Sequence, residues 1–292
     1  ANTVFGFGAM YQAGPLIDGE DCSNSVAIGS RALFRIRFLD QNTAIGANAL
    51  SNLLSAESNT AIGYEALRSN DDGEKNTAIG SGALANSTSV TNTAIGAASG
   101  VALTTGGGNT AIGYLAMAVT NTANTTAIGA ATFPTASNQI RVGNASVSSI
   151  GGQVAWTSIS NGTTKTDVKE DIPGMAFVKM LKPVTYYFNP EAMQKYNKEL
   201  APAVTLNSSI FSERHAGLIA QDVLSAAKGY SNNGLTDIIS QPATKDGLHS
   251  INYELMVVPL IKTIQEQQAT LASVKKLIEE LEKQLKTVES TQ

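Results

Sequence analysis

The sequence is poor in the residues that build disulfides and metal sites. Cys22 is the only cysteine among 292 residues, so a disulfide within one chain is impossible. His215 and His249 are the only histidines, and with a single cysteine they disfavour a zinc site within one chain. We expect both histidines to be structural, and we expect no metal and no cofactor.

Long apolar runs and strong charge are also absent. No stretch approaches the length of apolar sequence that a membrane-spanning helix needs, so the chain is not expected to span a membrane. The formal net charge is −4, and neither half is strongly basic. We therefore expect no nucleic acid partner.

A short motif recurs through the first half of the chain. The pentapeptide Asn-Thr-Ala-Ile-Gly begins at Asn42, Asn59, Asn76, Asn92 and Asn109. Near-copies end at Gly29 and Gly129, and residues 2–6 resemble a divergent first copy. A step of about 17 residues is typical of a solenoid built from stacked coils. Residues 1–137 are accordingly predicted to form a β-solenoid shaft.

Each repeat predicts a strand, a bend, a second short apolar piece and a polar loop. Thr43, Ala44 and Ile45 suit a strand, and side chains alternate between its two faces. If Ile45 points inward, Thr43 points inward with it and Ala44 points the other way. Each coil has few large apolar side chains, so we expect three chains to pack around an axis with the isoleucines inside.

The C-terminal 41 residues, 252–292, predict a coiled coil. From Val257 onward, apolar side chains recur at alternating steps of three and four, as in the heptads of a coiled coil. Gln267 is the one polar residue among the heptad core positions. It is either a tolerated defect or a residue that fixes the register of the helices. β-branched residues at both core positions favour three strands. Pro259 predicts a kink or a later helix start.

Charged residues become denser near residue 159, which predicts a boundary there. Residues 138–159 are interpreted as a connector, and residues 160–251 as a small α+β domain. Within that domain we predict a short helix over 176–181, a strand over 183–188, and a strand that passes into a helix over 217–228. The fold class is therefore mainly β: a trimeric parallel solenoid shaft, a small α+β domain and a trimeric coiled coil.

The repeats resemble the head repeats of trimeric autotransporter adhesins and the β-roll shafts of phage tail fibres. From Arg141 to the C-terminus, the chain resembles the intramolecular chaperone domain of endosialidases and related phage tail fibres, a self-cleaving serine peptidase. The segments that carry this resemblance, in order, are 140–144, 149–152 with Trp156, 169–172, 181–186, 217–223, 251–253 and Gln265-Glu266-Gln267.

The resemblance implies a cleavage site. The family reads Ser-Asp-x-Arg-x-Lys where this chain has residues 160–165. By resemblance, Ser160 is the nucleophile, Lys165 the general base and Ile159–Ser160 the scissile bond, with Asn161 and Gly162 in support. A serine hydroxyl needs such a base, and a lysine can serve when burial lowers its pKa.

Two departures leave alternatives open. Asn161 and Thr163 stand where the family has an aspartate and an arginine. The site is therefore either a single-turnover Ser–Lys peptidase or a degenerate site in a domain that still assembles the trimer. No turnover of an external substrate is expected in either case.

The functional expectation is an extracellular homotrimeric fibre or adhesin, located either in a virion tail fibre or on a bacterial surface. A cell-surface glycan or protein is the receptor that such a fibre would contact. The alternatives are a bacterial surface adhesin whose chaperone domain does not cleave, and an ice- or glycan-binding solenoid. For the last, Thr43 and its equivalents would form the ladder, while Tyr64 and Tyr114 could stack on sugars.

Overall fold

The computed structural model describes residues 1–11, 23–35, 40–117, 121–144, 146–147, 149–153, 156–158, 160–193, 209–230, 233–240 and 249–290. The chain divides into two compact units: residues 1–152 with 188–213, and residues 153–187 with 214–292. Cys22 lies outside the described residues. The two units are described separately below.

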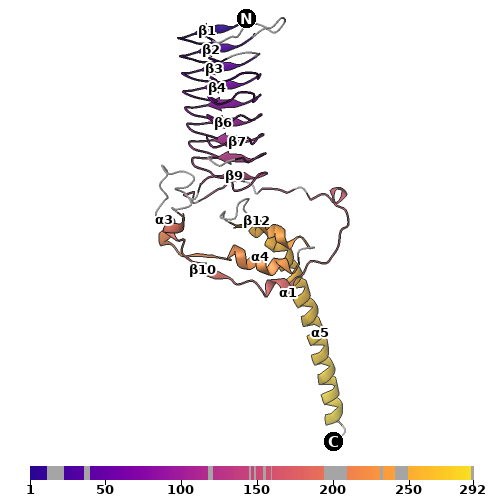
Figure 1. The fold of residues 1–292 in the computed structure, drawn as a ribbon. Helices are drawn as coiled ribbons and strands as arrows, with labels where there is room; N and C mark the ends of the chain where they lie inside the picture. The colour runs from indigo at the N-terminus through magenta and orange to yellow at the C-terminus, as the bar shows by residue number, and fades with distance from the viewer. Residues whose placement is uncertain are drawn as a thin grey trace. The chain divides into compact units, whose positions relative to one another are not determined.

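The first unit is a parallel β-solenoid, as the repeats predict. Its nine strands stack in chain order to form one sheet (Figure 1). They are β1 Thr3–Phe5, β2 Val26–Ile28, β3 Thr43–Ile45, β4 Thr60–Ile62, β5 Thr77–Ile79, β6 Thr93–Ile95, β7 Thr110–Ile112, β8 Thr126–Ile128 and β9 Ile140–Val142. β1 pairs with β2, so the divergent first copy is confirmed as a coil. A short helix, α3 Ser209–Ser212, also belongs to this unit.

The strand register places equivalent residues of successive repeats side by side. Thr43 pairs with Thr60, Ala44 with Ala61 and Ile45 with Ile62, and the same register continues to β8. A repeat that keeps its length within one residue therefore builds continuous columns of like side chains along the solenoid.

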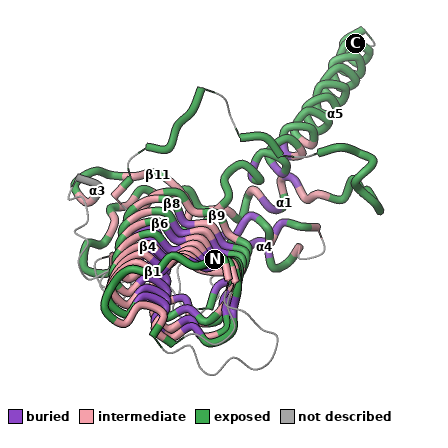
Figure 2. Tube along the Cα trace, turned by 90° about the horizontal axis from the view of Figure 1, so that it is seen from above, coloured by how far each residue is buried: buried purple, intermediate pink, exposed green. Residues whose placement is uncertain are grey.

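An inward position of Ile45 and Thr43 is wrong for the interior of the single-chain coil. Ala44 is completely buried, whereas Ile45 and Thr43 are only partly covered. Figure 2 shows the buried residues along the inside of the coils. The alanine faces inward because the coil is narrow, and a methyl group fills the space that an isoleucine would overfill. The isoleucines and threonines form the outer face of the sheet.

The interior also contains a second column of buried side chains, which come from equivalent positions of the repeats. Leu50, Leu67, Leu84 and Met117 are all fully buried. Together with the alanine columns they form one continuous cluster through the solenoid. The coil of a single chain thus encloses its own hydrophobic core. The expectation that its apolar side chains are too small and too few to fill a core is not met for the interior of the coil.

Several of these leucines adopt an unusual backbone conformation. The φ angles of Leu50, Leu67 and Leu84 are 48°, 50° and 49°, in the left-handed region. This conformation costs roughly 1–2 kcal/mol for a residue with a β-carbon. Complete burial of a leucine side chain contributes roughly 1.5–3 kcal/mol. The burial offsets the strain, so leucine holds a bend where glycine would be expected.

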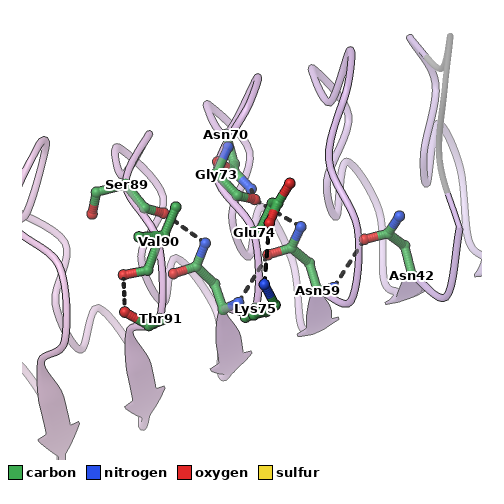
Figure 3. Close-up of polar contacts among 10 residues, drawn as sticks. Asn42, Asn59, Asn70, Gly73, Glu74, Lys75, Ser89, Val90 and Thr91 are labelled. Carbon is green, nitrogen blue, oxygen red and sulfur yellow. Dashed lines mark hydrogen bonds and ion pairs between the residues drawn. The ribbon is translucent and has the colours of Figure 1, made fainter.

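Buried asparagines complete the interior. The backbone N–H of Asn59 donates to the side-chain oxygen of Asn42 at 2.9 Å, and the backbone N–H of Asn76 donates to that of Asn59 at the same distance (Figure 3). The side-chain nitrogen of Asn59 donates to the carbonyl of Gly73 at 2.8 Å. Both ends of the amide are therefore satisfied, as a buried polar group requires.

The second unit is a small α+β arrangement followed by a long helix. Its elements are η1 Gly162–Thr164, α1 Met175–Val178, β10 Val184–Tyr186, β11 His215–Gly217, α4 Ala220–Lys228, η3 Leu235–Ile238, β12 Ile239–Ser240, β13 Ser250–Ile251, η4 Tyr253–Met256 and α5 Val257–Glu289. β10 pairs with β11, and β12 with β13, both antiparallel. The predicted helix over 176–181 and strand over 183–188 are confirmed in type, with shifted ends. Over 217–228 a strand is followed by a helix as predicted, but the strand ends at Gly217 and the helix already begins at Ala220.

The core of this unit joins α1, α4, η3 and η4. Phe177 of α1 is fully buried and packs with Val223, Ile238 and Met256. The rings of Phe177 and Tyr230 meet edge to face at 6.2 Å. Helix α5 begins at Val257, so Pro259 lies in the first turn, where a missing N–H costs nothing. No helix among the described residues has the length and apolar character needed to cross a membrane.

Candidate functional site

Ser160 and Lys165 are brought together by a single turn of 3-10 helix. The Nζ of Lys165 donates a hydrogen bond to the Oγ of Ser160 at 2.7 Å. This distance lies within the hydrogen-bond range in which a base can take the proton of a serine hydroxyl. Ile159, the other side of the predicted scissile bond, lies outside the described residues.

The turn exists because Asn161 caps it. The Oδ1 of Asn161 accepts a hydrogen bond from the backbone N–H of Thr163 at 3.0 Å and another from its hydroxyl, also at 3.0 Å. The hydroxyl of Thr164 donates to the carbonyl of Asn161 at 2.7 Å. These bonds reverse the chain between Ser160 and Lys165, so their side chains meet across five residues.

The two residues that differ from the family pattern therefore contact each other. Asn161 and Thr163 form a neutral hydrogen-bonded pair where an aspartate and an arginine would form a charged one. Neutral bonds are about half as strong as charge-assisted ones. Thr163 is the residue whose contribution the sequence pattern did not reveal, because its role depends on the turn.

The site is open to solvent. Ser160, Asn161, Gly162 and Lys165 are all exposed. A β-carbon placed on Gly162 would have no neighbour within 4 Å, so no residue in the described part of the chain covers this side of the turn. The burial that a lysine base requires is thus absent around the turn in a single chain.

Helix α5 holds the segment that follows this turn. The Oε2 of Glu266 accepts a hydrogen bond from the backbone N–H of Met175 at 2.7 Å. Gly174 lies so close to α5 that a β-carbon there would stand 2.8 Å from the backbone carbon of Lys262. The amide of Asn233 donates to the carbonyl of Asp171 at 2.8 Å. These contacts fix residues 171–177 to the rest of the second unit.

Glu266 lies in the Gln265-Glu266-Gln267 segment, one of those that carry the family resemblance. That segment does not predict the contact with Met175, because nothing in a single sequence connects residue 266 with residue 175. The contact spans 91 residues and became visible only in the fold.

Helix α5 has one covered face and one open face. Only Pro259 and Thr263 are buried, and they lie on the side that contacts α1. The heptad core residues are open: Val257 is 52% exposed, Ile264 58% and Leu271 63%. Further core residues that are about half exposed are Leu260, Val274, Ile278, Leu281, Leu285 and Val288.

An apolar groove of about 790 Å³ lies in the second unit. Leu181, Val184, Ala216 and Met256 are among the side chains that line it. Leu260 also borders it, so the groove is continuous with the open face of α5 at its N-terminal end. The groove offers few polar groups, so it is suited to apolar packing and not to chemistry.

Tyr64 and Tyr114 lie on the outside of the solenoid, 54% and 47% exposed. A hydrogen bond with Glu65, strengthened by the charge of that carboxylate, raises the pKa of Tyr64 above its ordinary value. Glu65 also forms an ion pair with Arg68 at 2.7 Å. The two tyrosines occupy separate coils, three repeats apart, and do not form a common surface.

Among the described residues, no three His, Cys, Asp or Glu side chains are grouped closely enough to hold a metal ion. His215 instead packs its ring against Tyr186 at 5.9 Å, within the β10–β11 pair.

Comparison with known proteins yields no relative: no protein-family model, no curated protein and no solved structure matches this chain. The resemblance to tail-fibre chaperones and adhesin heads therefore stays a prediction from the quoted motifs.

Proposed function

We propose that this protein is an extracellular homotrimeric fibre or adhesin, in which the region from residue 160 onward drives trimer assembly and carries a single-turnover Ser–Lys self-cleavage site. The solenoid is the shaft that would contact a cell-surface glycan or protein. The extracellular setting rests on the resemblance of the repeats to adhesin heads and tail-fibre shafts.

The observation that carries the proposal is the open apolar face of α5. This helix has 33 residues, and its heptad core residues are about half exposed along the whole length. A single helix that exposes such a row to water is unfavourable, and supercoiling with identical helices buries it. The side that contacts α1 lies away from this row, so the small domain leaves it open.

The outer face of the solenoid sheet supports the same assembly. Ile79, Ile95, Ile112 and Ile128 are each 37–39% exposed in a continuous column. The column lies beside that of the threonines because the strand register is uniform. Three such sheets facing a common axis would bury the isoleucines, which agrees with the expectation that they lie inside a trimer.

The proposed cleavage uses only groups in the turn. Lys165, as the free amine, takes the proton of the Ser160 hydroxyl. The Oγ attacks the carbonyl carbon of Ile159, the peptide C–N bond breaks as Lys165 gives the proton to the departing nitrogen, and the free amine stays on Ser160. Water then hydrolyses the resulting ester. Since the turn is open in one chain, neighbouring chains would supply the cover that a lysine base needs.

Why an assembly domain would be useful follows from topology. Thin shafts depend on contacts in register between chains, which form slowly and expose strand edges meanwhile. A C-terminal coiled coil that first brings three chains together would shorten the time during which strand edges are exposed. Removal of the assembly domain afterwards would leave a kinetically stable product.

The test is the mass of the full chain in native solution, followed by a denaturing gel of wild type, Ser160→Ala and Lys165→Ala. We expect a trimer, and a new fragment with Ser160 at its N-terminus in wild type only. A trimer that stays uncut in all three proteins would establish the alternative, a surface adhesin whose site is degenerate. A folded monomer would overturn the assembly proposal itself.

A second control concerns the turn. Thr163→Ser keeps both donors to Asn161 and should leave cleavage unchanged, whereas Asn161→Ala removes the acceptor and should slow it strongly. Equal cleavage by the two variants would show that the turn does not position the pair.

One observation favours a different candidate function. The outward threonines and isoleucines form a flat, regularly spaced face, with strands about 4.8 Å apart. Such a face suits an ordered surface such as ice, or a glycan array. The two functions exclude each other on this face, because the proposed trimer buries it. Thermal hysteresis by a monomeric protein would favour the ice-binding solenoid.

A further inference from the structure

The chain contains two Asn–Gly pairs, and they lie in very different surroundings. They are Asn161-Gly162 and Asn233-Gly234. In such a pair the glycine nitrogen can attack the asparagine side-chain carbonyl carbon, since glycine has no side chain to hinder the approach and its backbone is flexible. The reaction needs no enzyme.

We propose that Asn161-Gly162 is a spontaneous deamidation site, which converts the residue next to Ser160 into aspartate or isoaspartate. The bond from the Gly162 nitrogen to the Cγ of Asn161 forms, and the bond from Cγ to Nδ2 breaks. The proton of the Gly162 N–H leaves with the released ammonia. Water then opens the cyclic imide at either carbonyl, and the two openings give the two products.

The surroundings of Asn161 permit the reaction. The side chain is exposed, and η1 contains no buried residue. In the closed turn the ψ angle of Asn161 is 129° and its Oδ1 is engaged by Thr163. The turn must therefore open before the Gly162 nitrogen reaches Cγ. A solvent-exposed turn held by a few local hydrogen bonds opens at low cost.

The surroundings of Asn233 restrain the same chemistry. Its Nδ2 is tied to the carbonyl of Asp171 at 2.8 Å, a contact between distant parts of the chain. Gly234 caps η3 at a φ of 70°, and η3 carries the buried residues Leu235 and Ile238. Opening this pair would disturb the core of the unit, so Asn233 should react more slowly than Asn161.

Either product changes the Ser160–Lys165 pair. Aspartate places a negative charge beside the lysine that contacts Ser160. Isoaspartate adds a methylene to the backbone between the two residues, which alters the separation that the turn sets. Deamidation is thus a chemical change with age, located at the candidate site and independent of whether that site cleaves.

The experiment uses the full chain, incubated in mildly alkaline buffer made with heavy-oxygen water and then digested for peptide mass analysis. The heavy isotope separates conversion during incubation from conversion during digestion. Peptides that contain residue 161 are recovered whether or not the chain is cut before Ser160. The readout therefore does not depend on the proposed function.

The matched control is Gly162→Ala. Gly162 is not among the glycines of positive φ, and a β-carbon there meets nothing within 4 Å, so the alanine fits without strain. We expect conversion at Asn161 to exceed that at Asn233 several-fold in wild type. In the variant, conversion at Asn161 should fall by an order of magnitude and conversion at Asn233 should not change.

Three results would overturn the inference. They are an Asn161 that stays unconverted, an Asn161 that converts no faster than Asn233, and a rate at Asn161 that the alanine does not lower. The last would mean that water attacks the side chain directly, without the cyclic intermediate.

Discussion

The side-chain oxygen of Asn76 accepts a hydrogen bond from the backbone N–H of Asn92 at 2.9 Å. The other asparagines that begin the Asn-Thr-Ala-Ile-Gly motif likewise accept a backbone N–H from the coil that follows. Asn76 also donates from its side chain to the carbonyl of Ser89 at 2.7 Å. The residue is fully buried. One buried amide therefore links two successive coils.

Replacing Asn76 by alanine should leave the buried N–H of Asn92 and the partly buried carbonyl of Ser89 without this partner. We expect a loss of about 2–4 kcal/mol in the free energy of unfolding, since each such group costs about 1–3 kcal/mol. The control is Asn86→Ala, because Asn86 is exposed and makes one hydrogen bond, to Val101. Its effect should stay within about 0.5 kcal/mol. Urea unfolding followed by circular dichroism measures both, and equal losses would contradict the role of the ladder.

Gly80 and Gly82 provide a test of coil spacing. A β-carbon on Gly80 would lie 2.5 Å from the carbonyl oxygen of Gly96, and its φ is +134°, whereas one on Gly82, at φ +67°, would meet nothing within 4 Å. We expect Gly80→Ala to cost about 3–5 kcal/mol, from strain and overpacking together. Gly82→Ala should cost about 1 kcal/mol, from backbone strain alone.

Thermal unfolding of these two variants gives the comparison directly. If both alanines destabilise the protein by a similar amount, then the close approach of successive coils does not limit the residue type at position 80.

The open face of α5 predicts the effect of one charge on assembly. Ile278→Asp places a carboxylate in the heptad core and should lower the trimer fraction or abolish it. Ala272→Asp adds the same charge outside the core, on an exposed position of the same helix, and should leave the trimer intact. Sedimentation of both variants at several concentrations tests this, and trimers of equal stability would exclude α5 as the assembly helix.

The bond between Glu266 and Met175 predicts a local effect on the second unit. Glu266→Ala removes a charge-assisted acceptor from the N-terminus of α1 and should cost about 1.5–3 kcal/mol. Glu279→Ala removes an exposed carboxylate from the same helix and should be nearly neutral. Hydrogen exchange of the amides over 174–181 measures the effect, and unchanged protection in Glu266→Ala would show that the bond contributes little.

Much of the fold is predictable from the sequence because the repeats leave few choices. The spacing of Ile45, Ile62 and Ile79 sets one coil per repeat, and the strand register follows. The heptad row that begins at Val257 predicts α5. Pro259 predicts a kink or a later helix start, and α5 begins at Val257, after the predicted start at residue 252. In the candidate site, motif resemblance predicts that Ser160 and Lys165 act together. The structure places a hydrogen bond between them, and their roles as nucleophile and base stay a prediction.

Three features depend on contacts that no local pattern records. The neutral pair of Asn161 and Thr163 holds the turn, but a departure from a motif does not show how its residues compensate. The left-handed leucines are stable only because the closed coil buries them. Glu266 reaches a backbone N–H that lies 91 residues away in the chain.

By itself, the sequence determined the repeat length, the alternation of the strand faces and the heptad row of the last helix. Only the tertiary structure decided which strand face is the interior. Alternation separates Ala44 from Thr43 and Ile45, but the width of the closed coil selects the methyl group and leaves the isoleucine outside. The physical reason is volume: a coil this narrow admits small side chains beside its leucines and hydrogen-bonded asparagines, and that limit arises only when the chain closes on itself.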